Sequence, residues 1–308
     1  MLLWPFRDES GRAVLAAAVG RASPWIFPII VLTAFAGWVG DSLTSAIVFR
    51  RFGTPITFYE MWCLRGATYL FDAISPTLGM AATGLMMFRR GTPLARTVQV
   101  MLLLTVIAII QLIAMAGLGF ALGQSEVSSL SGRVVTFTLL GAAVYLVLVA
   151  AKPAVVARRR AFAQLFELGV GGHAFTFAVR TPPMVVVFAS QVATLHCFGI
   201  SVPLASLLVY VPALLVVTGA PISVQGLGPA QMAQVAFFAG HVGGDPRAAE
   251  ATVIAWGLIT TVGAALVWLL IGLGCAFTRS GRMLFAATKS AAREAAGLEP
   301  TEKIRSRS

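Results

Sequence analysis

The chain has 308 residues, of which 58% are hydrophobic and only 11% are charged, whereas a soluble domain has about 25% charged residues. So few charged side chains cannot cover a water-soluble particle, which excludes a soluble enzyme and indicates that lipid surrounds most of the chain. The net charge of +11 is carried by short clusters between apolar runs, a pattern typical of cytoplasmic membrane anchors and not of a nucleic-acid surface.

The first segment, residues 1–23, combines apolar side chains with arginines. We expect it to form a short helix that lies in the membrane interface. It lacks the ordered n-, h- and c-regions of a cleavable signal peptide, so we expect it to be retained.

Five apolar runs are long enough to cross about 30 Å of hydrocarbon, which takes about 20 residues. We predict a membrane-spanning helix from each of them. They cover residues 25–49, 98–122, 134–151, 174–198 and 248–277.

Two further apolar stretches, residues 61–88 and 202–240, are broken. The first is split at Ser75-Pro76 and the second by the sequence Pro-Ile-Ser-Val-Gln-Gly-Leu-Gly of residues 221–228. Proline removes a helix donor, and backbone groups freed at membrane depth must be satisfied by protein or by water in a cavity. Each stretch is therefore either a kinked span or a re-entrant pair of helices.

Positive charge favours the re-entrant interpretation. If neither broken stretch crosses the membrane, five crossings remain and all four basic clusters fall on one side. The positive-inside rule then places that side, and the C-terminus, in the cytoplasm. The clusters are Arg50-Arg51, then Arg89, Arg90 and Arg96, then Lys152 with Arg158 to Arg160, then the tail from Arg279.

The two halves of the chain repeat the same sequence signals. Each half has a span that closes with Phe-Gly, a proline 22 or 23 positions after that glycine, and a Gly-x-Pro-x-Ala sequence before the next span. The matching positions are Gly53 with Gly199, Pro76 with Pro221, Gly91 with Gly244 and Pro93 with Pro246.

We interpret these signals as two inverted repeats, 24–122 and 174–277, within an all-α, polytopic membrane domain (24–277). Residues 134–168 would supply a linking span and an amphipathic connector, and residues 278–308 a basic cytoplasmic tail. Inverted repeats with paired broken helices are a recurring build of transporters, with the substrate site where the breaks meet. Chance is the rival explanation, because glycine and proline are common in membrane helices.

The residues around the two breaks form two motifs. Pro221-Ile-Ser-Val-Gln-Gly-Leu-Gly-Pro-Ala-Gln231 is similar to a Pro-[Ile/Val]-Ser-x-x-Gly-Leu-Gly-x-x-Glu signature, and Asp72-Ala-Ile-Ser-Pro-Thr-Leu-Gly79 is similar to an Asn-x-x-x-Pro-x-x-Gly-[Asp/Glu]-x-x-Arg segment. Both belong to the flippase-like membrane domain of lysylphosphatidylglycerol synthases, which the chain resembles over about residues 25–277.

The resemblance implies a fold that moves an anionic or polyprenyl-linked lipid between the leaflets of a bacterial inner membrane. The bifunctional synthases also carry a soluble aminoacyl-transferring domain after the membrane domain. Only residues 278–308 follow here, so we expect no enzymatic activity of that kind. We expect no cofactor and no metal, because the sequence shows no ligand cluster or phosphate loop.

This sequence departs from the family at three charged positions. The family's glutamate falls on Gln231, its acidic residue after the first glycine on Met80, and its arginine on Thr83. Either the substrate differs, or the charged groups are supplied elsewhere, or transport has been lost. The third possibility favours a different class of protein, a non-transporting scaffold that holds a membrane enzyme in place.

Three charged residues lie within the apolar stretches of the first half, where a charge is by default a sign of function. Asp72 would contact a headgroup or shuttle a proton; otherwise it caps the next half-helix or pairs with Arg65. Asp41 would line the same cavity, or pair with a basic residue of another helix. Arg65 would bind a phosphate, or extend to the cytoplasmic interface.

The second break supplies the rest of the expected substrate site. Unwound amides beside a half-helix N-terminus form a natural anion site, although polar side chains there can equally satisfy broken backbone. The residues that we expect to line the site, in addition to the three charged ones, are Pro76, Gly79, Pro221, Ser223, Gln225, Gly226, Gly228 and Gln231.

Overall fold

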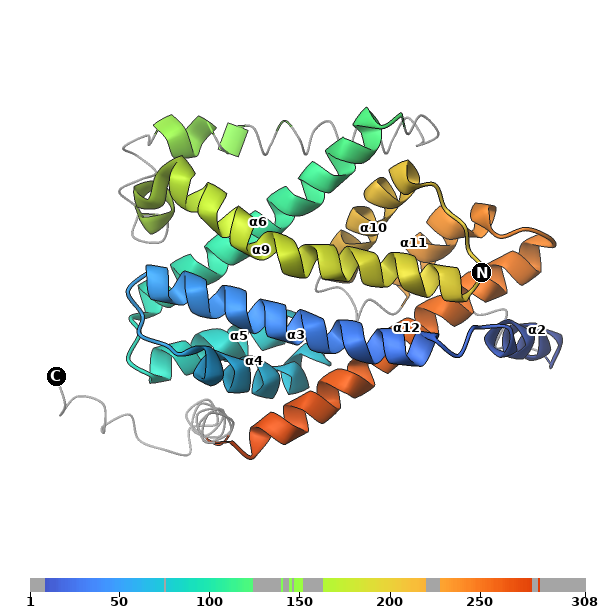
Figure 1. Cartoon of the computed structure of the whole chain (residues 1–308), viewed down its shortest axis with the longest axis horizontal. Helices are drawn as coiled ribbons and strands as arrows, with labels where there is room; N and C mark the ends of the chain where they lie inside the picture. Colours follow the sequence, from blue (N-terminus) through green and yellow to red (C-terminus); the bar gives the residue numbers. More distant parts are fainter. Residues whose placement is uncertain are drawn as a thin grey trace, which may run out of the picture.

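The structure is a computed structural model that describes residues 9–74, 76–123, 140, 144–145, 147–151, 163–219, 228–278 and 282. Every regular element among these residues is a helix (Figure 1). The elements are α2 (Glu9–Gly20), α3 (Ile26–Arg51), α4 (Phe58–Asp72), α5 (Pro76–Arg89), α6 (Leu94–Ala121), α9 (Ala163–Cys197), α10 (Leu204–Gly219), α11 (Pro229–Phe238), the 3-10 turn η2 (Ala239–His241) and α12 (Pro246–Ala276).

Three of the predicted spans are confirmed as helices that are long and apolar enough to cross a membrane: α3, α6 and α12. Their surfaces are also apolar, since α3 exposes Trp25 at its start and Phe27 and Leu32 further along. Large apolar side chains in these positions are stable when they face lipid. The predicted helix at the N-terminus is present as α2.

The run at residues 174–198 lies inside α9, a helix of 35 residues whose backbone breaks at Gly169, with φ 59° and ψ −170°. Arg180, Pro182 and Pro183 make α9 less apolar than the three helices above. Of the run at residues 134–151, the structure describes only a few positions near its end, all helical, and the rest lies outside the described residues, as does much of the amphipathic connector.

Both predicted breaks fall between helices. α4 ends at Asp72 and α5 begins at Pro76; α10 ends at Gly219 and α11 begins at Pro229. Proline suits the first turn of a helix because its missing N–H has no partner there in any case. Pro76, the proline at the first predicted break, therefore begins the second helix of its pair. Pro221, the proline at the second predicted break, lies outside the described residues, and α11 begins at Pro229.

The two helices of the first pair run antiparallel, and an ion pair joins them at their open end, where the chain enters and leaves the pair. Glu60, in the first turn of α4, accepts a hydrogen bond of 2.6 Å from Arg90, which follows α5. The Thr57 side chain and the Glu60 carboxylate form a capping box with each other's backbone N–H groups. The chain thus enters and leaves the α4–α5 pair at the end where α3 finishes and α6 begins (Figure 1).

Long helices cross one another around these pairs. α3 and α9 lie side by side and run in opposite directions (Figure 1). α12 packs on α4, α3 and α2, while α6 packs on α10 and α9. One apolar core, around Phe49, Leu64 and Leu103, joins α3, α4, α5 and α6. A second core, around Phe238 and Trp256, joins α9, α10, α11 and α12.

Candidate functional site

Charged side chains from three helices meet inside the first half of the molecule. Arg65 of α4 donates from Nε to Oδ2 of Asp41 on α3, at 2.5 Å, and its Nη2 lies 3.6 Å from Oδ2 of Asp72. The three side chains are only 12% to 25% exposed. Charges removed from water are stable only when they are paired and hydrogen-bonded, so this network holds α4 against α3.

Two threonines complete the surroundings of Arg65. Its Nη1 donates to the hydroxyl of Thr83 at 2.9 Å and to that of Thr68 at 3.2 Å. The Thr83 hydroxyl donates in turn to the carbonyl oxygen of Gly79 at 2.9 Å. One guanidinium therefore connects α3, α4 and α5.

The two arms of the α4–α5 pair approach closely at Gly79. A β-carbon at this position would overlap the carboxylate of Asp72. Glycine lets the acid of one helix lie directly against the backbone of the next. The space beside Gly79, which we expected to line the substrate site, is therefore filled by a side chain of the protein itself.

α3 and α9 cross at Gly40 and Pro183, where a β-carbon on Gly40 would lie 2.9 Å from that of Pro183. Because Pro183 has no N–H, the carbonyl oxygen of Val179 loses its helical donor. The Thr44 hydroxyl lies 3.4 Å from that oxygen and can donate to it. This crossing brings Arg180 of α9 into electrostatic contact with Asp41 and Arg65.

Arg180 differs from Arg65 in having no hydrogen bond or ion pair within the described part of the chain. Its Nε is buried and without a partner. Beside it, Gln111 of α6 donates to the carbonyl of Phe177 at 3.0 Å and to the hydroxyl of Thr181 at 3.3 Å, while Gln111 Oε1 is also buried without a partner. Unsatisfied polar atoms thus gather along this turn of α9.

The structure brings together the part of the expected site that belongs to the first break. Asp41, Arg65, Asp72 and Gly79 are neighbours, and Pro76 begins α5. Asp41 pairs with a basic residue of another helix, which was one of its two expected roles. Arg65 turns into the protein, so the expectation that it extends to the interface is wrong.

The second break is described only at its end. Gly228, with φ 98°, precedes α11, and Gln231 lies half-buried in the first turn of that helix. α11 packs on α10 and α12. Four residues expected in the site lie outside the described residues: Pro221, Ser223, Gln225 and Gly226.

Two contributors to the cluster were not expected from the sequence, Arg180 and Thr68. The sequence could have indicated Arg180, because it is a lone arginine within an apolar run, two positions before Pro182-Pro183. A charge within a membrane helix is by default a sign of function. Thr68 had no such signal, since threonine is common in membrane helices.

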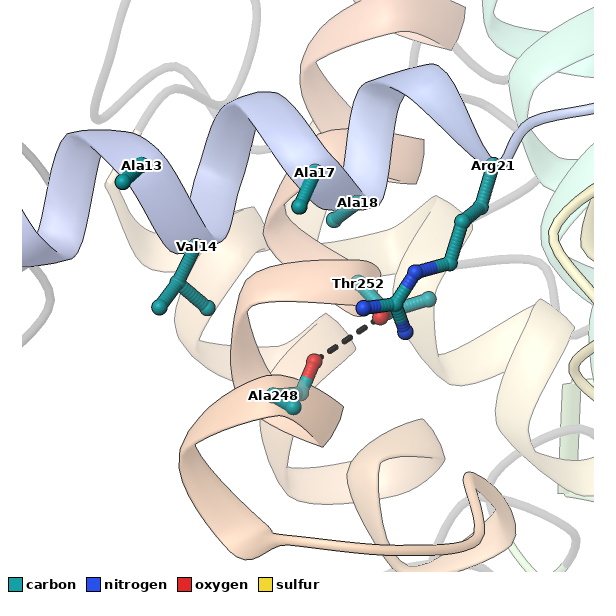
Figure 2. A pocket seen from close by; sticks show the side chains of 7 residues that line it. All are labelled: Ala13, Val14, Ala17, Ala18, Arg21, Ala248 and Thr252. Carbon is teal, nitrogen blue, oxygen red and sulfur yellow. Dashed lines mark hydrogen bonds between the residues drawn. The ribbon is translucent and has the colours of Figure 1, made fainter.

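A small groove lies between α2 and α12, far along α3 from the charged cluster (Figure 2). Its volume is about 300 Å³. The Thr252 hydroxyl is already engaged with the carbonyl of Ala248 at 2.8 Å, so the groove offers little specific chemistry beyond Arg21. Its lining residues are Ala13, Val14, Ala17, Ala18, Arg21, Ala248 and Thr252.

Comparison with family models, with curated proteins and with solved structures found no match to this chain. Within the described ranges, no group of three or more His, Cys, Asp or Glu side chains could hold a metal ion. The site is therefore defined by its own chemistry, which is a network of buried arginines and aspartates between crossing helices.

Proposed function

We propose that this protein moves an anionic lipid or polyprenyl-linked molecule between the leaflets of a bacterial inner membrane. The observation that carries the proposal is the cluster of Asp41, Arg65, Asp72 and Arg180, buried between α3, α4 and α9. Charges within membrane helices are costly and mark pathways for substrates or ions. Two inverted repeats would expose this cluster to each side of the membrane in turn.

Matching turns support the inverted repeat. Residues 52–54 and 198–200 lie 146 positions apart. In each turn the first and third residues donate their backbone N–H groups to one carbonyl oxygen, that of Phe49 or that of Leu195. The central glycine has φ of 72° in the first turn and 68° in the second.

The crossing of α3 and α9 supports the same symmetry. Under the offset of 146 positions, Thr44 corresponds to Ser190 and Val179 corresponds to Thr33. Thr44 donates to Val179, and Ser190 donates to Thr33 at 3.1 Å. The first bond ends on a backbone carbonyl oxygen and the second on a hydroxyl, but both join corresponding positions of the two proposed repeats. This correspondence supports a two-fold axis between α3 and α9, near Gly40 and Pro183.

The last helices of the two proposed repeats, α6 and α12, also have matching features. α6 and α12 each begin after a glycine with positive φ, Gly91 at 90° and Gly244 at 99°. Near its far end, α6 has Gly119 tightly packed against α10, and α12 has Gly272 tightly packed against α4. The last helix of each proposed repeat thus packs through glycine on the first helix of the other repeat's pair.

Charge supports a re-entrant α4–α5 pair that enters from the cytoplasmic side. Arginines gather where α3 ends, where α5 ends and where α6 begins, and these places lie at one end of the molecule (Figure 1). An excess of arginine is typical of cytoplasmic loops. The residues are Arg50, Arg51, Arg89, Arg90 and Arg96.

The resemblance to the flippase-like domain of lysylphosphatidylglycerol synthases supports lipid as the cargo. That family's arginine falls on Thr83, and here the Thr83 hydroxyl contacts Arg65. This contact favours the possibility that the missing guanidinium is supplied from elsewhere, by α4. Asp72, against Gly79, would similarly supply an acid close to the position where the family has one and this chain has Met80.

A scaffold for a membrane enzyme is the second candidate function, and the hydrogen bonds of Arg65 favour it. The guanidinium is occupied by Asp41, Thr68 and Thr83, as expected for a purely structural network. A scaffold would carry bulk lipid only, and an enzyme would co-purify with it.

The test is a leaflet-exchange assay in liposomes that contain fluorescent phosphatidylglycerol and the full chain. We expect the wild type to move the probe faster than empty liposomes do, and the double variant Asp72→Ala, Gln225→Ala to move it much more slowly. Glu60→Gln, at the open end of the α4–α5 pair, is the matched control and should behave as the wild type. Movement no faster than in empty liposomes, with only bulk lipid retained on mass spectrometry, would favour the scaffold.

A further inference from the structure

We infer that Arg180 binds the oxyanion of the transported molecule, a phosphate or carboxylate group, at the crossing of α3 and α9. This assignment rests on the proposed function and gives its substrate site a specific binding group. Phosphate binding was one of the two roles that the sequence left open for Arg65, and this assignment gives that role to a residue of the other proposed repeat.

The hydrogen-bonding capacity of the two arginines differs. Arg65 uses Nε and Nη1 for Asp41, Thr68 and Thr83, and its Nη2 faces Asp72. Arg180 makes no such contact with any described residue, although its Nε is buried. A buried donor without an acceptor is costly, and such groups in native proteins call for an explanation.

The electrostatic surroundings of Arg180 compensate its charge only in part. Asp41 attracts it and Arg65 repels it, and the attraction is the larger of the two. Asp41 is hydrogen-bonded to Arg65, so this one carboxylate faces two guanidinium groups. A guanidinium placed in this way attracts an anion, and its planar fork suits the two oxygens of a phosphate or carboxylate.

The position of Arg180 fits a site that both repeats must reach. It lies three positions before Pro183, which meets Gly40 where the proposed two-fold axis passes. Gln111 of α6 donates to the neighbouring turn of α9, and its own buried Oε1 has no donor among the described residues. A hydroxyl of a bound headgroup would provide the kind of donor that this oxygen lacks.

The experiment compares anionic lipid retained by the wild type and by Arg180 variants, all as full chains in nanodiscs of phosphatidylcholine with phosphatidylglycerol. We expect Arg180→Gln to lower the phosphatidylglycerol enrichment about tenfold, the effect of losing one strong charge-assisted contact. Arg180→Lys keeps the charge but loses the fork, and should fall between. Arg247→Gln, an exposed arginine in the first turn of α12, is the matched control and should retain the lipid as the wild type does.

A melting temperature in lipid-free detergent separates binding from folding. Because Arg180 has no hydrogen bond or ion pair with any described residue, Arg180→Gln should melt at the wild-type temperature or above it. A markedly lower melting temperature would make Arg180 a structural residue and overturn the proposal. Undiminished phosphatidylglycerol enrichment in Arg180→Gln would also overturn it, and would leave lipid movement by the wild type unaffected.

Inorganic phosphate distinguishes the source of the oxyanion. If the ligand is a lipid headgroup, millimolar phosphate should stabilise the wild type far less than phosphatidylglycerol does. Stabilisation by phosphate that depends on Arg180, without selectivity among lipids, would keep Arg180 as the oxyanion-binding residue. It would assign the oxyanion to a water-soluble molecule and contradict lipid movement.

Discussion

The two helix pairs share a skeleton but differ in chemistry. The α4–α5 pair is held by charge and hydroxyls, through Arg65 and Asp72. In the α10–α11 pair, Tyr210 instead stacks on Phe237 with ring centroids 5.1 Å apart, and the residue 146 positions after Arg65 is Val211, which is fully buried. Among the described residues, the first pair therefore carries ion contacts, while the second pair packs through aromatic and aliphatic side chains.

The pairs also differ in how they are attached. α4 packs along both α3 and α12, whereas α10 packs mainly on α6 and only weakly on α9. Ion contacts add directional restraints on the first pair that apolar contacts do not provide for the second. If the two pairs exchange conformations during transport, we expect the α10–α11 pair to be the one that moves more easily in the state described here.

The largest effect should come from Asp41→Ala. It leaves Arg65 buried without its main partner, and breaking a buried ion pair from one side costs about 3 to 5 kcal/mol. Thermal or denaturant unfolding in detergent measures the loss. Val187→Ala, at the corresponding position of the proposed second repeat, should stay within about 1 kcal/mol. Equal effects of the two substitutions would remove the contrast between the halves.

A smaller difference should separate Gly79→Ala from Gly257→Ala. A β-carbon at Gly79 meets the short, held carboxylate of Asp72, while one at Gly257 meets the amide end of the longer Gln234 side chain. Overpacking typically costs about 1 to 3 kcal/mol, and we expect that range for Gly79→Ala and a smaller loss for Gly257→Ala. The melting temperatures of the two variants test the order, and the reverse order would count against a rigid first pair.

Trp256→Phe tests a polar contact that ties α12 to α9 in the second core. The indole N–H donates to the Thr194 hydroxyl at 3.0 Å inside the protein. Losing this hydrogen bond should lower the free energy of unfolding by about 1 kcal/mol, and the smaller phenyl ring of the variant should add to that loss. Thr194→Val removes the acceptor instead and should cost a similar amount in the same unfolding assay. No loss from either variant would mean that shape alone holds the second core.

The smallest effect should come from Glu60→Gln, outside the buried network. The Thr57 backbone N–H and Arg90 lower the pKa of Glu60 to about 2. Its stabilising contribution is therefore present above the unfolded pKa, about 4.3, and is lost as the pH falls toward 2. Because Glu60 is partly exposed, we expect less than about 1 kcal/mol at neutral pH. Unfolding curves at pH 7 and pH 3 should differ less in the variant than in the wild type.

The sequence alone was sufficient for the features that depend on local composition. Apolar length predicted α3, α6 and α12, because any helix that crosses lipid must bury its own backbone hydrogen bonds over a fixed distance. Pro76, predicted as a break, lies where a new helix begins, because proline is disfavoured inside a helix and suited to its first turn.

Only the tertiary structure decided which charges meet. Asp41 and Arg65 lie on different helices, and Arg180 lies on a third helix far along the chain. Nothing local could show that Asp41 satisfies Arg65 while Arg180 keeps a buried Nε without a partner. The position of Arg180 beside this pair depends on the close approach of α3 and α9 at Gly40, where a missing side chain allows two distant segments to touch.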